Sequence, residues 1–302
     1  MSWLTGLAAC VLLAQALPDP RENNLDNCTF ELVIVDDRPL PKRSFEVNPD
    51  TFWSMTAVVN YVYAKSHGYG FQYVQATNSS LTGRQSGWHK VLFMAQRLRE
   101  VVDQECLWFL YIESDAFVRE IDTPLPSLVS RLLRRYHRPV AFAGEPAVIF
   151  ARERSIEHPF GLGHSVKFFQ PAKAWLNSGV FLVKANDASR RLFDAWAAQC
   201  NGSESGERDH RDLASWSDLD QAVITNLVDQ NVDGFRDTVL AVDMLEFNSP
   251  WGRFVQHNWG DEHTDRGDAF WDALVRIDYT GLPRIHQALK SIRRGSIVWK
   301  PR

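Results

Sequence analysis

The chain has 302 residues, of which 45% are hydrophobic and 23% charged, as is ordinary for a globular protein that buries a core. This length suits one large α/β domain or two small ones. The formal net charge of −4 implies no basic face and argues against a nucleic-acid partner, whereas phosphate binding stays open because a bound metal can supply positive charge locally.

The N-terminus has the pattern of a secretory signal. An apolar run over residues 4–17 ends in Ala14-Gln15-Ala16, an A-x-A-like cleavage site, and Pro18 follows. The run is short for a membrane span and no Lys or Arg precedes it, so an uncleaved anchor or a buried helix remains an alternative. We predict that residues 1–17 are a signal peptide or signal anchor.

Sequons and cysteines fit the same route. N-glycosylation sequons begin at Asn27, Asn78 and Asn201. Once Cys10 is removed with the signal, the remaining cysteines can form at most one disulfide. They are Cys28, Cys106 and Cys200. We therefore predict a protein of the secretory pathway, in the Golgi lumen or secreted, with no membrane contact beyond an N-terminal anchor.

The first half of the chain alternates apolar strands with helices. The strands are predicted at residues 30–35, 69–74 and 106–112, and the helices from Asn48-Pro49 to His67-Gly68 and over 88–102. Strands that are apolar on both faces indicate a mostly parallel central sheet flanked by helices. Because such sheets bind ligands beyond the carboxyl ends of their strands, the end of the third strand is the first place to look for chemistry.

The second half continues the α/β pattern less regularly. Helices are predicted at residues 124–137, 187–200 and 218–228, strands at 140–143, 175–183 and 239–242, an irregular stretch at 144–171, and a polar loop at 202–215. The last stretch carries Gly, Pro, Trp and His in predicted loops. We find no repeat and no clear linker, so residues 28–302 are predicted to be a single domain.

An acidic triplet, Glu113-Ser114-Asp115, follows the third strand. On an extended segment, carboxylates two residues apart point to the same face. Hard oxygen ligands suit Mn²⁺ or Mg²⁺, which often bind through few carboxylates together with substrate phosphates. An acidic loop that caps the next helix is the alternative.

Several segments resemble, in the same order, one group of GT-A glycosyltransferases. They are Trp88-His89-Lys90 (W-x-K), Leu-Tyr-Ile-Glu-Ser-Asp-Ala-Phe at 110–117 (W-L-D-x-D-A), Leu-Asn-Ser-Gly-Val-Phe-Leu at 176–182 (L-N-T-G-x-F-L), Asp220-Gln221, and Phe-Val-Gln-His-Asn-Trp-Gly at 254–260 (V-x-H-x-x-G). The group contains fungal Golgi galactosyl- and mannosyltransferases and plant xyloglucan xylosyltransferases. The resemblance spans about residues 30–260 and implies the α/β GT-A fold, the Rossmann-like fold of nucleotide-diphospho-sugar transferases.

The resemblance implies a metal centre. Asp115 would be the direct metal ligand, and Glu113 would contact the metal or the ribose. Glu113 departs from the family, which has Asp at this position, and its longer side chain puts the geometry in question. His257 would be the second protein ligand or a diphosphate contact, and imidazole suits Mn²⁺. The alternative for His257 is a loop histidine bonded to the backbone.

Two more segments would shape the sugar and acceptor pocket. Asn177 has an amide that both donates and accepts, and Gly179 permits close backbone approach. Asp220 would lie near the anomeric carbon or bind acceptor hydroxyls, with Gln221 as its neighbour on the helix. A simple turn and helix capping by Ser217 or Asp218 are the structural alternatives.

The remaining candidates would bind the donor. Lys90 could offset phosphate charge, although a lone helix lysine is more often a solvated surface residue. Asp36 and Asp37 end the first strand, where such folds receive the nucleotide base, but turn formation explains them equally well. Ser114 belongs to this group as the middle residue of the acidic triplet.

The predicted function is transfer of a hexose or pentose from a nucleoside diphosphate sugar to a hydroxyl of a glycan or glycoprotein. UDP-sugar is the first expectation and GDP-mannose the second, and the resemblance implies retention at the anomeric carbon. The alternatives are an inverting GT-A enzyme with Asp220 as general base, a non-catalytic glycan-binding relative, and a metal-dependent hydrolase.

Overall fold

A computed structural model of the chain describes most of the predicted α/β region. The described residues are 25–42, 51–77, 87–101, 106–136, 145–153, 175–200, 220–258, 270, 272, 273, 275 and 282–300. The predicted signal, the sequons at Asn78 and Asn201, the strand at 140–143 and the loop at 202–215 lie outside them. Among the described residues, no helix combines the length and apolar character needed to cross a bilayer.

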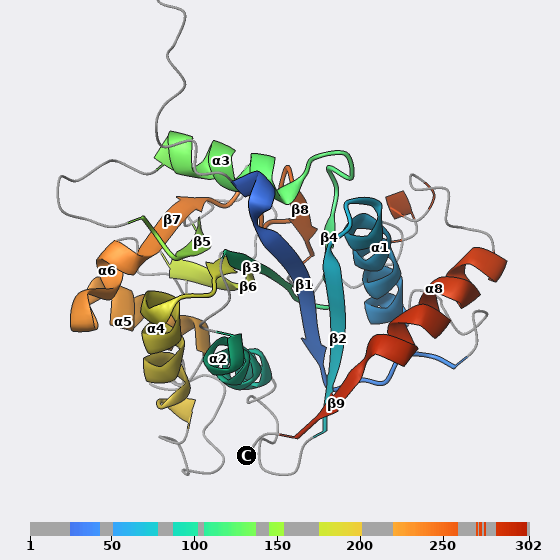
Figure 1. Cartoon of the computed structure of the whole chain (residues 1–302), viewed down its shortest axis with the longest axis horizontal. Coiled ribbons are helices and arrows are strands. Elements are labelled where there is room, and N and C mark those ends of the chain that lie inside the picture. Colours follow the sequence, from blue (N-terminus) through green and yellow to red (C-terminus); the bar gives the residue numbers. More distant parts are fainter. Residues whose placement is uncertain are drawn as a thin grey trace, which may run out of the picture.

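A seven-stranded sheet forms the centre of the molecule (Figure 1). Its strand order is β7-β5-β6-β3-β1-β2-β9. The bounds are β1 (Thr29–Asp36), β2 (Gly70–Ala76), β3 (Leu107–Ile112), β5 (Val148–Glu153), β6 (Trp175–Lys184), β7 (Val239–Asp243) and β9 (Ile297–Trp299). Strand β6 is antiparallel to both of its neighbours, and all other pairings in this sheet are parallel. The predicted mostly parallel sheet is therefore confirmed.

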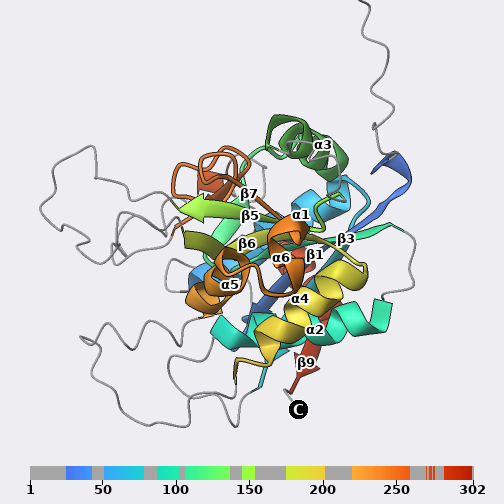
Figure 2. The same ribbon diagram turned by 90° about the vertical axis from the view of Figure 1, so that its left-hand side faces the viewer.

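Helices cover both faces of this sheet (Figures 1 and 2). One face carries α2 (Trp88–Val101), α4 (Asp187–Ala197), α5 (Asp220–Asp229) and α6 (Phe235–Thr238), with the short turn η7 (Val232–Gly234) before α6. The other carries α1 (Phe52–Ser66) and α8 (Leu282–Gly295) over β1 and β2, and α3 (Leu125–Tyr136) over β3 and β6. The turn η1 (Leu25–Asn27) precedes β1.

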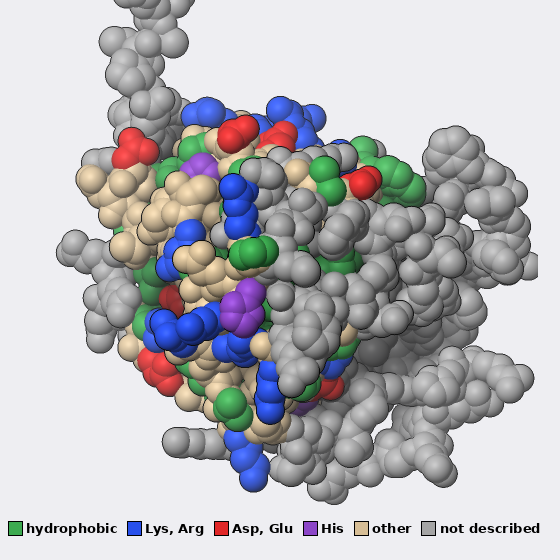
Figure 3. Space-filling view, turned by 90° about the vertical axis from the view of Figure 1, so that its right-hand side faces the viewer, with side chains coloured by type: hydrophobic (Ala, Val, Ile, Leu, Met, Phe, Trp, Pro, Cys, Tyr) green, Lys and Arg blue, Asp and Glu red, His purple; other side chains and the backbone are tan. Residues whose placement is uncertain are grey.

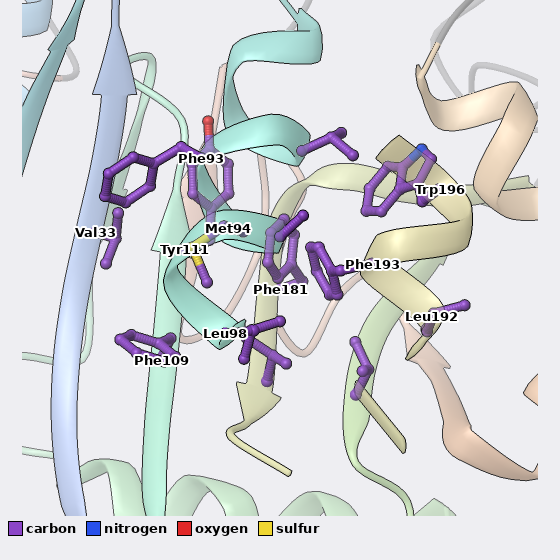
Figure 4. Packing of buried hydrophobic residues seen from close by; sticks show 14 of the residues in the cluster. Val33, Phe93, Met94, Leu98, Phe109, Tyr111, Phe181, Leu192, Phe193 and Trp196 are labelled. Carbon is purple, nitrogen blue, oxygen red and sulfur yellow. The ribbon is translucent and has the colours of Figure 1, made fainter. Parts of the chain in front are cut away.

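Aromatic side chains fill the core between the sheet and α4 (Figure 4). Phe181 of β6 packs 5.5 Å from Phe193, and Phe193 packs 5.3 Å from Trp196, measured between ring centroids. Trp196 is fully buried, and its indole N–H donates to the backbone carbonyl of Asp220 at 2.9 Å. Because a buried indole N–H needs an acceptor, this bond fixes the first residue of α5 against the core.

A disulfide joins Cys28 to Cys106, at the beginnings of the neighbouring strands β1 and β3. Cys200 is a buried free thiol. This pairing is one of those that the odd number of cysteines left open.

Two predicted stretches require correction. Strand β5 lies inside the stretch predicted to be irregular, because it is buried between β6 and β7. The last part of the chain, predicted as loops, contains α8 and β9. Helix α1 begins at Phe52 after Thr51, and the start predicted at Asn48-Pro49 lies outside the described residues.

Helix α8 lies in a stretch that we predicted to be loops. Its apolar residues Ile285, Ala288, Leu289 and Ile292 face α1 and β2, at the spacing of one helical stripe. Its exposed residues include Arg284, Lys290 and Arg294, and Lys and Arg side chains dot the surface on the side of the molecule where α8 lies (Figure 3). The sequence therefore carries a helical apolar stripe in a stretch whose Gly, Pro, Trp and His residues led us to predict loops.

Candidate active site

The acidic triplet forms a tight turn at the carboxyl end of β3. Ala116 N donates to Glu113 O at 3.0 Å, and Glu113 N donates to Gly179 O of β6 at 2.9 Å. Ser114 and Asp115 therefore occupy the tip of a turn rather than the extended segment we predicted. Strand β4 (Ala116–Val118) begins directly after the turn. The predicted position at the end of the third strand is correct, and the two carboxylates converge through the turn.

Helix α1 holds this turn from one side. Thr56 donates its hydroxyl to Ser114 O at 2.6 Å. The Asn60 amide donates to Ala116 O at 3.0 Å and accepts from Val118 N at 3.0 Å. Thr56 and Asn60 are fully buried, so these bonds fix the backbone on both sides of Asp115.

Strand β8 (Val255–His257) brings His257 to the turn. It pairs antiparallel with β4 so that His257 lies opposite Ala116, and Asn258 N donates to Asp115 O at 3.0 Å. His257 Nε2 lies 3.0 Å from Asp115 Oδ1 and 3.3 Å from Glu113 Oε2. One ligand atom from each of these three residues lies within 4.8 Å of the others.

Gly179 of β6 makes room for this group. A Cβ atom at this position would lie 2.3 Å from His257 Cε1 and 2.7 Å from Glu113 Oε2. Gly179 N donates to Asn177 Oδ1 at 2.8 Å. Because glycine has no Cβ atom, it permits the imidazole and the carboxylate to approach the strand this closely.

Lys90 links two acidic side chains beneath the turn. Its ammonium lies 2.5 Å from Glu113 Oε1 and 2.9 Å from Asp220 Oδ2, and the lysine is 4% exposed. The alternative reading of Lys90 as a solvated surface residue is therefore wrong. Ser178 Oγ donates to the same Asp220 oxygen at 2.7 Å, and Ser178 N lies 3.4 Å from Gln221 Oε1.

The charged side chains in this group shift one another's pKa values. Burial alone lowers the pKa of Lys90, but Asp220 and Glu113 raise it above its ordinary value. Burial raises the pKa of Glu113, but Lys90 and His257 bring it well below its ordinary value. Burial lowers the pKa of His257, but Asp115 and Glu113 raise it to about 9. Without a metal, the imidazole is therefore cationic at neutral pH and fills the space between the two acids.

A second polar group lies at the end of β1. Asp36 accepts from Arg38 three times: from the backbone N at 2.7 Å, from Nε at 2.9 Å and from Nη2 at 2.6 Å. Arg38 Nη2 also donates to Ser114 Oγ at 2.7 Å, which ties the end of β1 to the acidic turn. The guanidinium lies 4.9 Å from the ring centroid of Phe52 and 4.6 Å from that of Trp53.

A cavity of about 260 Å³ joins these two groups. Its lining includes Asp36, Asp37, Arg38, Phe52, His89, Tyr111 and all three residues of the acidic turn. It opens at the carboxyl ends of β1 and β3, where parallel sheets bind their ligands.

The chain belongs to the galactosyl transferase GMA12/MNN10 family. The family model matches residues 48–249, and the predicted resemblance is thereby confirmed. The chain is thus a glycosyltransferase with the GT-A fold. A search of curated proteins found no match.

Solved structures of other glycosyltransferases are similar to this chain to different degrees. A glycosyltransferase involved in the glycosylation of the major capsid of PBCV-1 is 14% identical, with a TM-score of 0.51, and the match covers 81% of this chain and 99% of that chain. The galactosyltransferase LgtC, in complex with donor and acceptor sugar analogs, is 14% identical with a TM-score of 0.39, over 86% and 95% of the two chains. The glycosyltransferase GlyE of Streptococcus pneumoniae is 11% identical with a TM-score of 0.41, over 88% and 64%. Of these likenesses the first supports the fold, and at 14% identity it bears on the fold alone.

The structure brings the predicted site residues into two connected groups. Glu113, Asp115, His257, Gly179, Lys90, Asp220, Asn177 and Gln221 surround the turn, and Asp36 and Ser114 line the cavity with Arg38. Sequence reasoning missed Arg38, Asn60, Ser178 and Asn248. Arg38 is next to the predicted Asp36-Asp37 pair and could have been found there. No local pattern indicates Asn248, because its amide bonds to Asn177, which lies 71 positions earlier in the sequence.

Proposed function

We propose that this glycosyltransferase moves a sugar from a nucleoside diphosphate sugar to a hydroxyl of a glycan or glycoprotein, with a divalent metal held by Glu113, Asp115 and His257. UDP-sugar is the first expected donor and GDP-mannose the second. The observation that carries the proposal is the convergence of two carboxylate oxygens and one imidazole nitrogen within 4.8 Å, at the carboxyl end of the sheet.

The distances from His257 to the two acids fit a manganese ion, with magnesium as the second choice. Two ligands held at about 2.1 Å and at right angles lie about 3 Å apart. His257 Nε2 lies 3.0 Å from Asp115 Oδ1 and 3.3 Å from Glu113 Oε2, which agrees with that spacing. A mixed oxygen and imidazole set suits borderline Mn²⁺. When bound, the ion would neutralise the charge of the departing diphosphate.

Lys90 and Asp220 extend the site toward the sugar in this proposal. Lys90 keeps Glu113 ionised and holds one oxygen of Asp220. A side chain at Gly87 would lie 2.8 Å from the other oxygen, Asp220 Oδ1, so glycine at this position keeps that oxygen approachable. We assign Asp220 and its neighbour Gln221 to the anomeric carbon or the acceptor hydroxyl.

Asn177 and Gly179 shape the wall of the same pocket. Asn177 Oδ1 accepts from Gly179 N at 2.8 Å and from Asn248 Nδ2 at 2.7 Å. Since these two donors occupy this oxygen, Asn177 contributes to the pocket by fixing the strand rather than by offering its carbonyl oxygen to the sugar.

The β1 end of the cavity would receive the nucleoside. Asp36 Oδ2 accepts one bond from Arg38 and keeps a second lone pair for a ribose or base donor, and Phe52 offers an aromatic face in the cavity lining. Ser114 connects this end to the metal ligands through Arg38. The retaining outcome and the Golgi or secreted location are part of the proposal as well, supported by the resemblance and by the N-terminal pattern.

The test is transfer and hydrolysis across a panel of sugar nucleotides, with Mn²⁺, with a chelator, and in an Asp115→Ala variant. We expect one donor to release its nucleoside diphosphate, and we expect a loss of about 10³-fold or more when Asp115 or the metal is removed, because the metal contributes several kcal/mol to the transition state. The anomer of the first product, read by NMR, decides between retention and inversion. Full activity in the presence of chelator would contradict the metal-dependent reading.

A further inference from the structure

The ring nitrogen of His257 that faces away from the acids, Nδ1, contacts Asn248. His257 Nδ1 lies 2.6 Å from Asn248 Oδ1. Both side chains are buried, with exposed fractions of 2% for His257 and 0% for Asn248. This contact lies on the side of the imidazole opposite the two acids.

The orientation of the Asn248 amide is set by its other contacts. Its Nδ2 lies 2.7 Å from Asn177 Oδ1, 3.3 Å from Asn177 O and 3.2 Å from Val180 O. All three neighbours are acceptors, so the group that faces them must be the NH₂ and the group that faces His257 must be the carbonyl oxygen.

This orientation determines the state of the imidazole. Because Asn248 Oδ1 only accepts, His257 Nδ1 must carry a proton. The nitrogen that can lose its proton is therefore Nε2, which points at Glu113 and Asp115. Metal-ligating histidines commonly donate their other ring N–H to such an acceptor, which fixes both tautomer and ring orientation.

The backbone of Asn248 is shaped for this contact. Its φ of 88° lies in the left-handed region, which asparagine tolerates better than most residues. The loop between β7 and β8 is held on both sides, since Asn248 N donates to Val255 O at 3.3 Å and His257 N donates to Ser249 O at 2.9 Å.

We propose that Asn248 is a positioning residue that presents His257 Nε2 to the metal. The inference rests on the proposed function, because it needs the metal site. It extends the site from the three ligands to a chain that runs from His257 through Asn248 to Asn177 and the backbone of β6.

The test is Mn²⁺ affinity, measured from the EPR signal of free Mn²⁺ in titrations of the purified protein. The central variant is Asn248→Gly, because glycine keeps the left-handed backbone and removes only the amide. We expect its affinity to fall between about tenfold and a hundredfold. The matched control is Asn231→Gly, since Asn231 also has a positive φ, of 52°, but is exposed, and its side chain accepts from the nearby Arg236 N, far from the acidic turn in the sequence. That control should bind Mn²⁺ as the wild type does.

A mutant cycle with His257→Ala separates positioning from general support of the fold. If Asn248 acts through the imidazole, Asn248→Gly should change the Mn²⁺ affinity by less than about twofold in the His257→Ala background. An equal loss in both backgrounds would overturn the inference. So would wild-type affinity in Asn248→Gly itself.

A second variant guards against a folding defect. Asn248→Asp keeps an acceptor for Nδ1–H but turns its second oxygen toward acceptors of Asn177 and Val180, so it is compared as a variant that melts like the wild type. Its Mn²⁺ affinity should then fall less than that of Asn248→Gly, and an equal or larger fall would contradict the inference. If the wild type binds no Mn²⁺, the metal-dependent function fails together with this inference. If the wild type binds and Asn248→Gly binds equally well, only the role of Asn248 fails.

Discussion

The two ends of the cavity hold their charges in different ways. At the end of β1, the guanidinium of Arg38 bonds to both carboxylate oxygens of Asp36. At the end of β3, three acids surround a buried lysine and an imidazole, and each cation is shared between two carboxylates. The first group is a closed pair, in which one cation and one carboxylate neutralise each other. The second is an acidic cluster whose charge balance depends on a proton at His257.

This difference separates the proposed tasks of the two ends. A closed ion pair has no charge left for an ion and is suited to neutral hydrogen-bonding partners such as a nucleoside. An acidic cluster that keeps an imidazole protonated can exchange that proton for a metal ion. The arrangement therefore predicts that substitutions at one end change metal binding and substitutions at the other change nucleotide binding.

The largest expected effect is on stability, in Lys90→Met. Methionine replaces the buried ammonium with an apolar group of similar length and leaves Glu113 and Asp220 facing each other. We expect the free energy of unfolding to fall by about 3 kcal/mol, since breaking a buried ion pair typically costs 3–5 kcal/mol and Glu113 is 30% exposed. Urea unfolding without metal measures the change.

The control for that variant is Lys184→Met. Lys184 pairs with Glu145 at 3.3 Å, but both side chains are more than a quarter exposed. Exposed pairs contribute little, so we expect a loss below about 1 kcal/mol. Equal losses in the two variants would mean that the acidic cluster does not depend on its buried cation.

The next effect is on metal affinity, in Gly179→Ala. The added methyl group would lie 2.3 Å from His257 Cε1 and 2.7 Å from Glu113 Oε2, so these two side chains cannot keep their present positions. We expect the Mn²⁺ affinity to fall about a hundredfold, as seen when the support of a metal ligand is lost. Gly295→Ala is the control, because a Cβ atom there has no neighbour within 4 Å. A Gly179→Ala variant with wild-type affinity would show that His257 is not a ligand.

The layered arrangement of the fold was predictable because the apolar composition of the strands indicates that both of their faces are buried. β3 is Leu-Trp-Phe-Leu-Tyr-Ile with every residue buried, a pattern that only a sheet covered on both faces explains. Composition does not show in which direction a strand runs, so the antiparallel orientation of β6 could not be predicted from its equally apolar sequence. Pairing between distant strands decides it.

The site was predictable to the extent that its residues stand at strand and helix ends. Glu113 and Asp115 follow β3, and Asp220 begins α5, so topology alone places them at one edge. The partners of these residues were not predictable. For Lys90, a donor contact and a surface position both stayed open, because nothing in its own helix shows that Glu113 and Asp220 meet above it.

The pH dependence of metal binding follows from His257. Its pKa of about 9 in the metal-free protein exceeds the ordinary value of 6.5, so the folded state binds this proton more tightly than the unfolded chain does. The stabilisation of the metal-free protein by this proton is fully present below pH 6.5 and is lost as the pH rises through about 9.

Mn²⁺ must displace the same proton. The apparent affinity should therefore rise with pH, by up to about tenfold per unit between pH 7 and 9, and level off above. Titrations followed by EPR between pH 6.5 and 8.5 measure the slope. In His257→Ala the slope should flatten, and a flat profile in the wild type would place the proton elsewhere.

The smallest effect is expected at the other end of the cavity, in Asp36→Asn. Asparagine keeps the shape and one acceptor oxygen but removes the charge that Arg38 and a nucleoside would share. We expect the affinity for a nucleoside diphosphate to fall about fivefold, or about 1 kcal/mol, the usual net contribution of one hydrogen bond. Calorimetric titration with Mn²⁺ present measures it, and the exposed Asp187→Asn is the control.

Because Asp36 forms a closed pair apart from the cluster, Mn²⁺ affinity itself should stay within about twofold of the wild type. A large loss of Mn²⁺ binding in Asp36→Asn would mean that the bond from Arg38 to Ser114 makes the two ends one electrostatic unit.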